Sequence, residues 1–334
     1  MPSLKEIKGR IGSVKSTLKI TSAMKLVASA KLRKAQVAVE NMRPYRERLD
    51  GILADLKAEI AARQEREEPV GEISTLYTTP RPEIRAVAIV AMASNSSLCG
   101  GFNANAVRLT LETVEKYRSM GVTDITVYSI GRKMADTMKK CGYPSPEDFT
   151  RLAEHPEYEG ISALGAALME AYAEGRFDRI EIVHNHFVST ASQKPICEAF
   201  LPQNAASSLR ADGFGKTNLV SATASPDRGP VRTARLPHPS ATPASGSSAS
   251  GSGFIVEPSP EEAWNQLLPQ VIRLSLYTAL LDSVAAEHAA RTIAMQTATD
   301  NGEDLLDDLT LEYNKGRQQK ITSEILDLVG GSLQ

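Results

Sequence analysis

The hydrophobic positions of the first 60 residues recur every three or four residues. The stripe contains Leu4, Ile7, Ile11, Val14, Leu18, Ala28, Leu32, Ala35, Val39, Leu49, Leu53, Leu56 and Ile60. A repeat of about 3.5 residues keeps one narrow seam on one side of a helix and is typical of a coiled coil. The spacing therefore predicts a helix over 1–60, about 90 Å long. Pro44 should bend this helix without ending it, because the pattern continues on both sides.

A second helical pattern occupies the other end of the chain. A serine, a proline and a glutamate within 259–262 form a helix start, because the serine accepts a hydrogen bond from a first-turn amide and the proline loses none there. Apolar residues then keep a helical spacing almost to Gly330, which would give about 105 Å of helix. We expect kinks at Pro269 and Gly302. The sequence thus predicts a second long helix over 259–334.

Strand and helix patterns alternate over 84–203, between the two helical ends. Residues 86–92 form a continuous apolar run that is typical of a buried strand. Further strands are expected at 124–130 and 179–188, and helices are expected up to Gly121, at 131–140 and at 161–174. This alternation predicts a small, mostly parallel, Rossmann-like α/β domain. The predicted fold class is α/β, with a long antiparallel coiled coil of the terminal helices and the α/β domain inserted between them.

Two connecting segments differ from these elements. Residues 204–253 are rich in Ser, Ala, Gly, Pro and Thr, and cannot bury enough apolar surface to offset the entropy lost on ordering. We expect a flexible insertion there; an ordered hairpin around 213–215 is the alternative. Residues 61–83 are expected to be a linker.

Charge sharpens the prediction of paired helices. The chain has 38 Lys and Arg against 40 Asp and Glu, a net charge of −2, which argues against a nucleic-acid partner. Residues 1–40, however, carry nine basic and two acidic side chains, whereas 261–334 carry five basic and twelve acidic ones. Opposite signs suit an antiparallel pair. The alternative is that each charged face is solvated, since surface ion pairs contribute little.

Candidate sites for chemistry are weak. The Gly100-Gly101 loop lacks the third glycine of a dinucleotide fingerprint, and the GKT of 215–217 lacks a preceding strand and the upstream glycine of a phosphate loop. His184 and His186 alternate on a strand and share a face, an arrangement that suits a pair of metal ligands. With no carboxylate or thiol at ligand spacing, a pair facing solvent or a partner is favoured. No nucleophile with a paired base stands out. We expect no catalytic residue, cofactor or metal.

The cysteine spacing and the hydropathy indicate the compartment. Three widely spaced cysteines suggest a reducing environment. The longest strongly apolar run, 86–93, is far shorter than the roughly 18 residues of a membrane helix, and no signal peptide pattern follows Met1. We expect a soluble chain that reaches a membrane only through a partner.

Four motifs carry a resemblance to a known family. They are ITSAMKLVASAKL at 20–32, SLCGGFN at 97–103, AARTIAMQTATDN at 289–301 and YNKGRQQKIT at 313–322. They resemble the signatures of the ATP synthase gamma subunit family and occur in its order along the chain. Only 204–253 lies outside the match, as an insertion.

The resemblance implies a non-catalytic rotor subunit of proton-translocating ATP synthase. In this family the terminal helices form a shaft inside the alternating alpha and beta subunits, and the α/β domain is a foot that binds epsilon and the c-ring. Proton flow turns ring and shaft together. Contact with the membrane is then indirect, and the lack of a presequence favours the cytoplasmic side of a bacterial inner membrane. A static coiled-coil scaffold and a Rossmann-type enzyme with helical extensions are the competing hypotheses.

The resemblance also implies contact residues on the shaft. Arg317 and Gln318 match the pair that hydrogen-bonds the beta catch loop, where a guanidinium can grip a carboxylate bidentately. Thr322 lies one turn further on the face of Gln318 and matches a third contributor. Met24 and Lys25 match the lower shaft position that faces the acidic lever of beta.

A further contact is implied at the foot. Residues 254–258, FIVEP, resemble the foot segment that touches polar loops of the c-ring, and are expected to be a strand that returns to the foot. Phe254 and Glu257 are the candidates; Val256 replaces the family's common tyrosine, so Glu257 is preferred. Chloroplast-type members carry a redox-sensitive cysteine pair in an extra segment, but 204–253 contain no cysteine.

Overall fold

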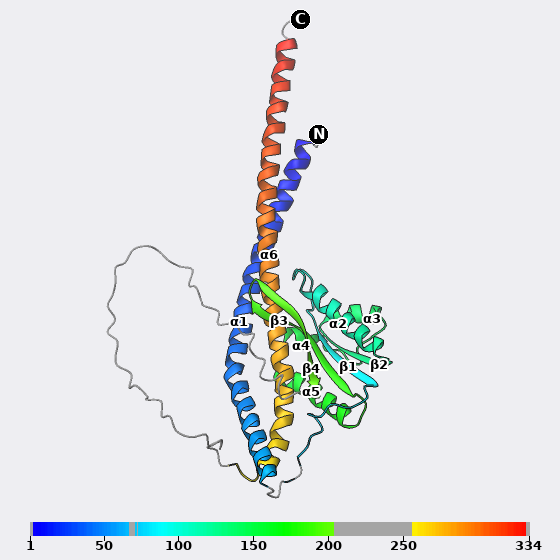
Figure 1. The fold of residues 1–334 in the computed structure, drawn as a ribbon. Helices are drawn as coiled ribbons and strands as arrows, with labels where there is room; N and C mark the ends of the chain where they lie inside the picture. Colours follow the sequence, from blue (N-terminus) through cyan, green and yellow to red (C-terminus); the bar gives the residue numbers. More distant parts are fainter. Residues whose placement is uncertain (1–2, 67–70, 72, 204–255, 332–334) are drawn as a thin grey trace, which may run out of the picture.

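The computed structural model has a long two-helix shaft with an α/β domain against the side of its lower part (Figure 1). The structure describes residues 3–66, 71, 73–203 and 256–331. The predicted insertion at 204–253, its alternative hairpin and Phe254 lie outside the described residues. The predicted fold class, an α/β domain inserted between two long terminal helices, is confirmed.

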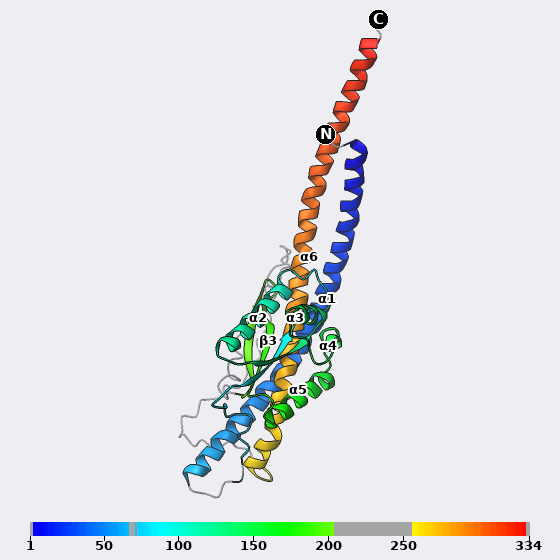
Figure 2. The same cartoon turned by 90° about the vertical axis from the view of Figure 1, so that its right-hand side faces the viewer.

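The shaft consists of α1, Leu4–Glu65, and α6, Pro260–Gly331. Ser3 begins α1 with a capping box, in which its hydroxyl accepts from the Glu6 amide while the Glu6 carboxylate accepts from the Ser3 amide. The helices continue through Pro44 in α1 and through Pro269 in α6. They run in opposite directions, and α6 extends well past the N-terminus of α1 (Figures 1 and 2).

The domain is built on a four-stranded sheet of order β2-β1-β3-β4. The parallel strands are β1, Ala86–Met92, β2, Asp124–Ile130, and β3, Arg179–Ser189. The fourth strand, β4, Ser192–Leu201, runs antiparallel to β3 and was not predicted. Most of its residues are only partly buried, so its sequence lacks the apolar run that marks the other strands.

Helices cover both faces of the sheet. Alternate β1 residues Val87, Ile89 and Ala91 pack with α2, Phe102–Ser119, and α3, Arg132–Lys140. The residues between them pack with α5, Tyr158–Ala173, and with α6. A short helix, α4, Thr150–Glu154, was not predicted. Because successive strand side chains point to opposite faces, one apolar strand serves both layers.

The predicted return strand does not extend over its described residues. Val256 belongs to no strand, and Glu257 and Pro258 form a bend before α6, with a cis peptide bond between them. Ser259 then begins α6, since its hydroxyl accepts a hydrogen bond from the Glu262 amide at 3.2 Å.

Candidate functional site: the shaft and its junction with the domain

The pairing of the two shaft helices is fixed by contacts along their length. Arg46 donates a hydrogen bond to the Thr278 hydroxyl at 2.7 Å, and Thr299 donates to the Thr21 hydroxyl at 3.0 Å. Higher on the shaft, small residues of α6 face leucines of α1. A Cβ added at Gly302 would lie 2.7 Å from a Leu18 methyl, and one added at Gly316 would lie 3.1 Å from a Leu4 methyl. Gly302, expected to be a kink, therefore lies within a continuous helix and permits a close approach.

The end of α6 has no facing helix. Since α1 begins at Leu4, beside Gly316, the residues of α6 beyond Gly316 extend past their partner. Residues 317–326 are all exposed. Arg317, Gln318 and Thr322 lie here. The Thr322 hydroxyl donates to the Gln318 carbonyl at 2.9 Å.

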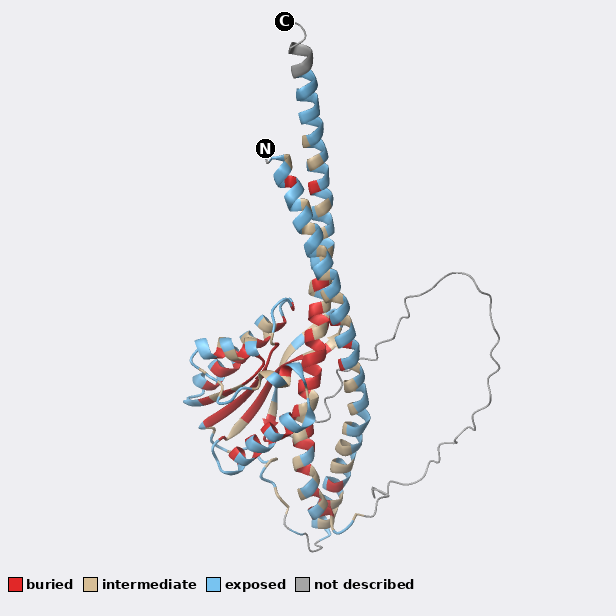
Figure 3. Ribbon diagram, turned by 180° about the vertical axis from the view of Figure 1, so that it is seen from behind, coloured by how far each residue is buried: buried red, intermediate tan, exposed pale blue. Residues whose placement is uncertain are grey.

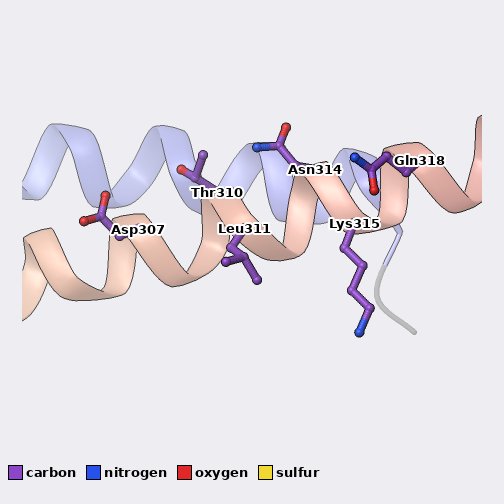
Figure 4. A pocket seen from close by; sticks show the side chains of 6 residues that line it. All are labelled: Asp307, Thr310, Leu311, Asn314, Lys315 and Gln318. Carbon is purple, nitrogen blue, oxygen red and sulfur yellow. The ribbon is translucent and has the colours of Figure 1, made fainter.

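A shallow groove runs along α6 just below this end (Figure 4). It is lined by Asp307, Thr310, Leu311, Asn314, Lys315 and Gln318. Gln318 therefore belongs both to the free end and to a mixed polar and apolar face of the helix.

Met24 and Lys25 occupy a different level of the shaft. Both are half-buried on α1, within one turn of Thr21, which contacts Thr299. Eighteen residues of α6 separate Thr299 from Arg317, or about 27 Å along the helix. The structure therefore keeps the two predicted contact groups apart, at two heights of the shaft.

Large apolar side chains are exposed along the upper shaft. On α1, Ile20, Leu26 and Val27 are 57–71% exposed, and on α6 the exposed set is Leu305, Leu311, Ile321, Ile325 and Leu326. Exposed apolar patches of this kind mark surfaces that another protein covers.

The opposite charges of the helices do not pair directly at this level. Among the described residues, no ion pair joins the basic side chains near the start of α1 to a carboxylate of α6, and lower down Arg63 lies 3.9 Å from Glu261 of α6. The upper helices are joined by apolar and small residues, and the basic face of α1 is exposed. The alternative of solvated charged faces therefore holds in the upper shaft.

The glycine loop forms a turn and a contact to the shaft. Gly100 and Leu98 adopt positive φ angles of 57° and 67° between β1 and α2. The Arg291 guanidinium of α6 donates to the Ser97 carbonyl at 2.6 Å and to the Ser96 hydroxyl at 2.9 Å. It also pairs with Glu287 at 2.8 Å.

His184 and His186 share a face, as predicted, but that face meets α6. The carboxylate of Asp282 accepts from His186 Nδ1 at 2.6 Å, and His184 Nε2 lies 3.5 Å away. Asp282 and His184 are buried. Burial alone would raise the pKa of Asp282, but hydrogen bonds from both histidines hold it below its ordinary value. The favoured prediction of a solvent- or partner-facing pair was therefore wrong, because the neighbouring carboxylate is 96 residues away in sequence.

The described residues contain neither a metal-binding cluster nor a membrane-spanning helix. No cluster of three or more His, Cys, Asp or Glu side chains there is arranged to hold a metal ion. None of the described helices is long and apolar enough to cross a membrane. Glu257, the preferred foot contact, is exposed at the bend before α6.

Known proteins similar to this chain span its whole length. A sequence model of a family described as ATP synthase matches residues 3–333. The ATP synthase gamma chain of Phocaeicola vulgatus is 44% identical over 333 residues, covering 100% of both chains. That of Bacteroides thetaiotaomicron is 42% identical over 335 residues, again covering 100% of both. The alignments thus extend across the segment at 204–253.

Solved structures share the fold. A chain in the OSCP/F1/c-ring part of the Euglena gracilis mitochondrial ATP synthase matches with a TM-score of 0.57 and 19% identity, covering 99% of this chain and 93% of that one. A chain in the central stalk and c-ring of the Tetrahymena thermophila mitochondrial ATP synthase matches with a TM-score of 0.50 and 19% identity, covering 84% of this chain and 99% of that one.

Proposed function

The chain belongs to the family of ATP synthase gamma chains, and from this premise we propose that it is the non-catalytic rotor shaft of a proton-translocating ATP synthase. The alpha and beta subunits would surround the upper shaft, and the α/β domain would be the foot that binds epsilon and the c-ring. The complex would lie at the cytoplasmic side of a bacterial inner membrane, which the chain itself reaches only through the c-ring.

The observation that carries this proposal is the free end of α6. It continues beyond α1 as a single helix, with residues 317–326 exposed and with apolar side chains on its surface. A surrounding partner would stabilise this exposed helix, because contact with the partner removes its apolar side chains from water. A ring of alpha and beta subunits supplies such a partner.

The proposed beta contacts use the two heights of the shaft. Arg317, Gln318 and Thr322 would meet the catch loop at the free end, and Met24 with Lys25 would meet the acidic lever about 27 Å lower. In this proposal these contacts would differ between the open and closed states of each beta subunit. Only such a difference allows rotation of the shaft to shift the conformational equilibrium of beta.

The proposed work requires a stiff molecule. One charge crossing 100 mV releases about 2.3 kcal/mol, so several protons must act through the shaft for each ATP. The foot contact to the c-ring would be made by Glu257, with Phe254 beside it in sequence. Glu257 is exposed and precedes α6 directly, so a force on it enters the shaft helix without passing through the sheet.

The test is a single substitution at the free end in the assembled complex. We expect Arg317→Ala to weaken the association with alpha and beta, or the coupling of ATP hydrolysis to proton pumping, by about 1.5–3 kcal/mol, the range of a charged hydrogen bond. Lys320→Ala is the matched control, because Lys320 is an exposed cation on the same end and forms an ion pair within its own helix, with Glu324 at 3.6 Å.

Three results would contradict the proposal. One is a chain that does not copurify with alpha and beta subunits. Another is ATP hydrolysis by the purified chain alone, which a non-catalytic shaft cannot perform. The third concerns the site: equal synthesis and hydrolysis rates in Arg317→Ala and in the unmodified complex would remove Arg317 from the contact.

A further inference from the structure

The shaft helix is enclosed where it passes the α/β domain. Residues 279–287 of α6 are all buried, and these nine residues span about 2.5 helical turns. A run of buried residues longer than one turn requires neighbours on every side of the helix. Figure 3 shows this buried stretch at the height of the sheet. Here α1 covers one side of α6 and the domain covers the rest.

Part of the surface of α6 that meets the domain consists of small side chains. Ala285, Ala286 and Ala289 are completely buried, and Ala290 is 9% exposed. Small apolar side chains let the backbones approach closely, but their attraction has no direction. This alanine stretch holds the domain against the helix, but by itself it offers little resistance to rotation of one about the other. Resistance comes from larger buried side chains of α6 lower down, such as Leu276 and Leu280, and from directional contacts at the edges of the alanine stretch.

One directional contact joins α6 to β3. Both oxygens of the Asp282 carboxylate are used: Oδ1 accepts from the Phe187 amide at 3.0 Å, and Oδ2 accepts from His186 at 2.6 Å with His184 at 3.5 Å. The Asp282 side chain is 9% exposed. A buried carboxylate with three donors loses much free energy if it leaves them.

The second directional contact joins α6 to the glycine loop through Arg291. Its guanidinium reaches Ser97 and Ser96 at 2.6 and 2.9 Å, as described above. Nine residues separate Asp282 from Arg291, which corresponds to about 13 Å of rise and leaves the two side chains about half a turn apart around the helix. The domain therefore holds α6 through two contacts on nearly opposite sides of the helix.

We propose that Asp282, with His184 and His186, and Arg291, with Ser96 and Ser97, form a clasp that fixes the angle of the α/β domain around α6. With both edges held, the domain cannot turn about the helix without breaking one set of bonds. Asp282 and Arg291 are the positioning residues on α6. If the chain is a rotor, as proposed above, the clasp passes rotation of the foot to the shaft without slip.

The test measures distances between two spin labels in the full chain, one on the domain and one on α6. The width of their distribution reports how far the domain turns about α6. One spin label goes on the native Cys141, which is exposed on the domain after α3, and a second on α6 through Asp304→Cys. We expect Asp282→Asn to widen the distribution of distances between the labels at least twofold. Asp307→Asn, the same chemical change at an exposed position of α6, should leave the width unchanged.

A second variant covers the case in which Asp282→Asn does not fold. His186 is 20% exposed in its side chain, and His186→Gln leaves the carboxylate bound to Phe187 and His184, so we expect folded chain with a widened distribution. A lowered melting temperature with an unchanged width in either folded variant would overturn the clasp and leave Asp282 only a stabilising role. Because the distances are measured on the chain alone, failure to assemble with alpha and beta would contradict the proposed rotor function and not the clasp.

Discussion

The three cysteine thiols have very different surroundings. Cys99 is buried in the glycine loop, and Cys141 is exposed after α3. Cys197 is an exposed residue, but its thiol donates to the Glu181 carboxylate at 2.7 Å. Burial and the nearby Glu181 charge raise the pKa of Cys197 to about 12. Only the thiolate is an effective nucleophile.

We therefore expect one thiol of the folded chain to react with an alkylating reagent at pH 8. Mass spectrometry of peptides should find the label on Cys141, and unfolding in denaturant should expose all three cysteines. Cys141→Ser should abolish fast labelling. Rapid modification of Cys197 in the folded chain would show that its bond to Glu181 does not form.

His288 gives the junction a dependence on pH. Burial, with the charges of Lys31 and Arg291, lowers the pKa of His288 from 6.5 to about 4. The folded chain thus resists a proton that the unfolded chain accepts. The contribution of neutral His288 to the free energy of unfolding is complete above pH 6.5 and is lost progressively as the pH falls toward 4.

Full burial would make this shift worth about 3 kcal/mol, and partial solvent access reduces it to roughly 1–2 kcal/mol. Between pH 7 and 4.5 the free energy of unfolding should fall less in His288→Gln than in the unmodified chain, by roughly 1–2 kcal/mol. Denaturant titrations at several pH values measure it. His155→Gln, at an exposed histidine, should follow the unmodified chain; an identical pH dependence in both variants would contradict the prediction.

At the scale of whole elements, the glycines of the shaft differ in what surrounds them. A Cβ added at Gly12 of α1 meets no atom of the described residues within 4 Å beyond its own turn of helix, whereas one added at Gly302 of α6 meets Leu18 at 2.7 Å. Alanine is favoured over glycine inside a helix by about 1 kcal/mol. At Gly302 this gain is opposed by the displacement of a packed leucine.

Gly12→Ala should accordingly stabilise the chain by about 0.5–1 kcal/mol, and Gly302→Ala should be less favourable by about 1 kcal/mol. Chemical denaturation provides the measurement. In a Leu18→Ala background the two alanine substitutions should have equal effects. If Gly302→Ala were as stabilising as Gly12→Ala with Leu18 present, the helices would not approach closely there.

For the whole molecule, the seam of α1 is occupied within the chain. Leu32, Ala35, Leu56 and Ile60 are buried in the core that includes α6. A static scaffold would use this seam to dimerise. We expect a monomer of 36.1 kDa at micromolar concentration in sedimentation, with an elongated shape, since α6 alone is about 108 Å long. A dimer whose formation is lost on mutating Leu32 and Leu56 to Ala would favour the scaffold.

The periodic elements were predictable because their signals are local. The 3.5-residue spacing of α1 and the apolar run of β1 reflect which side chains are buried along a single element, and neighbours in sequence suffice to show it. The polar and half-exposed β4 has no such run and was missed. The motif at 313–322 indicated the family; within it Gly316 lies close to Leu4 of α1, whereas residues 317–322 are exposed.

By itself the sequence determined the two long helices, the α/β domain between them and the family to which the chain belongs. Only the tertiary structure decided what His184 and His186 face, why Gly302 is small, and where α6 is enclosed. Each of these depends on residues about 100 or more positions apart, such as His186 with Asp282 or Leu18 with Gly302. Spacing along one strand or helix tells which side chains share a face, but the partner of that face is set by how separate elements pack.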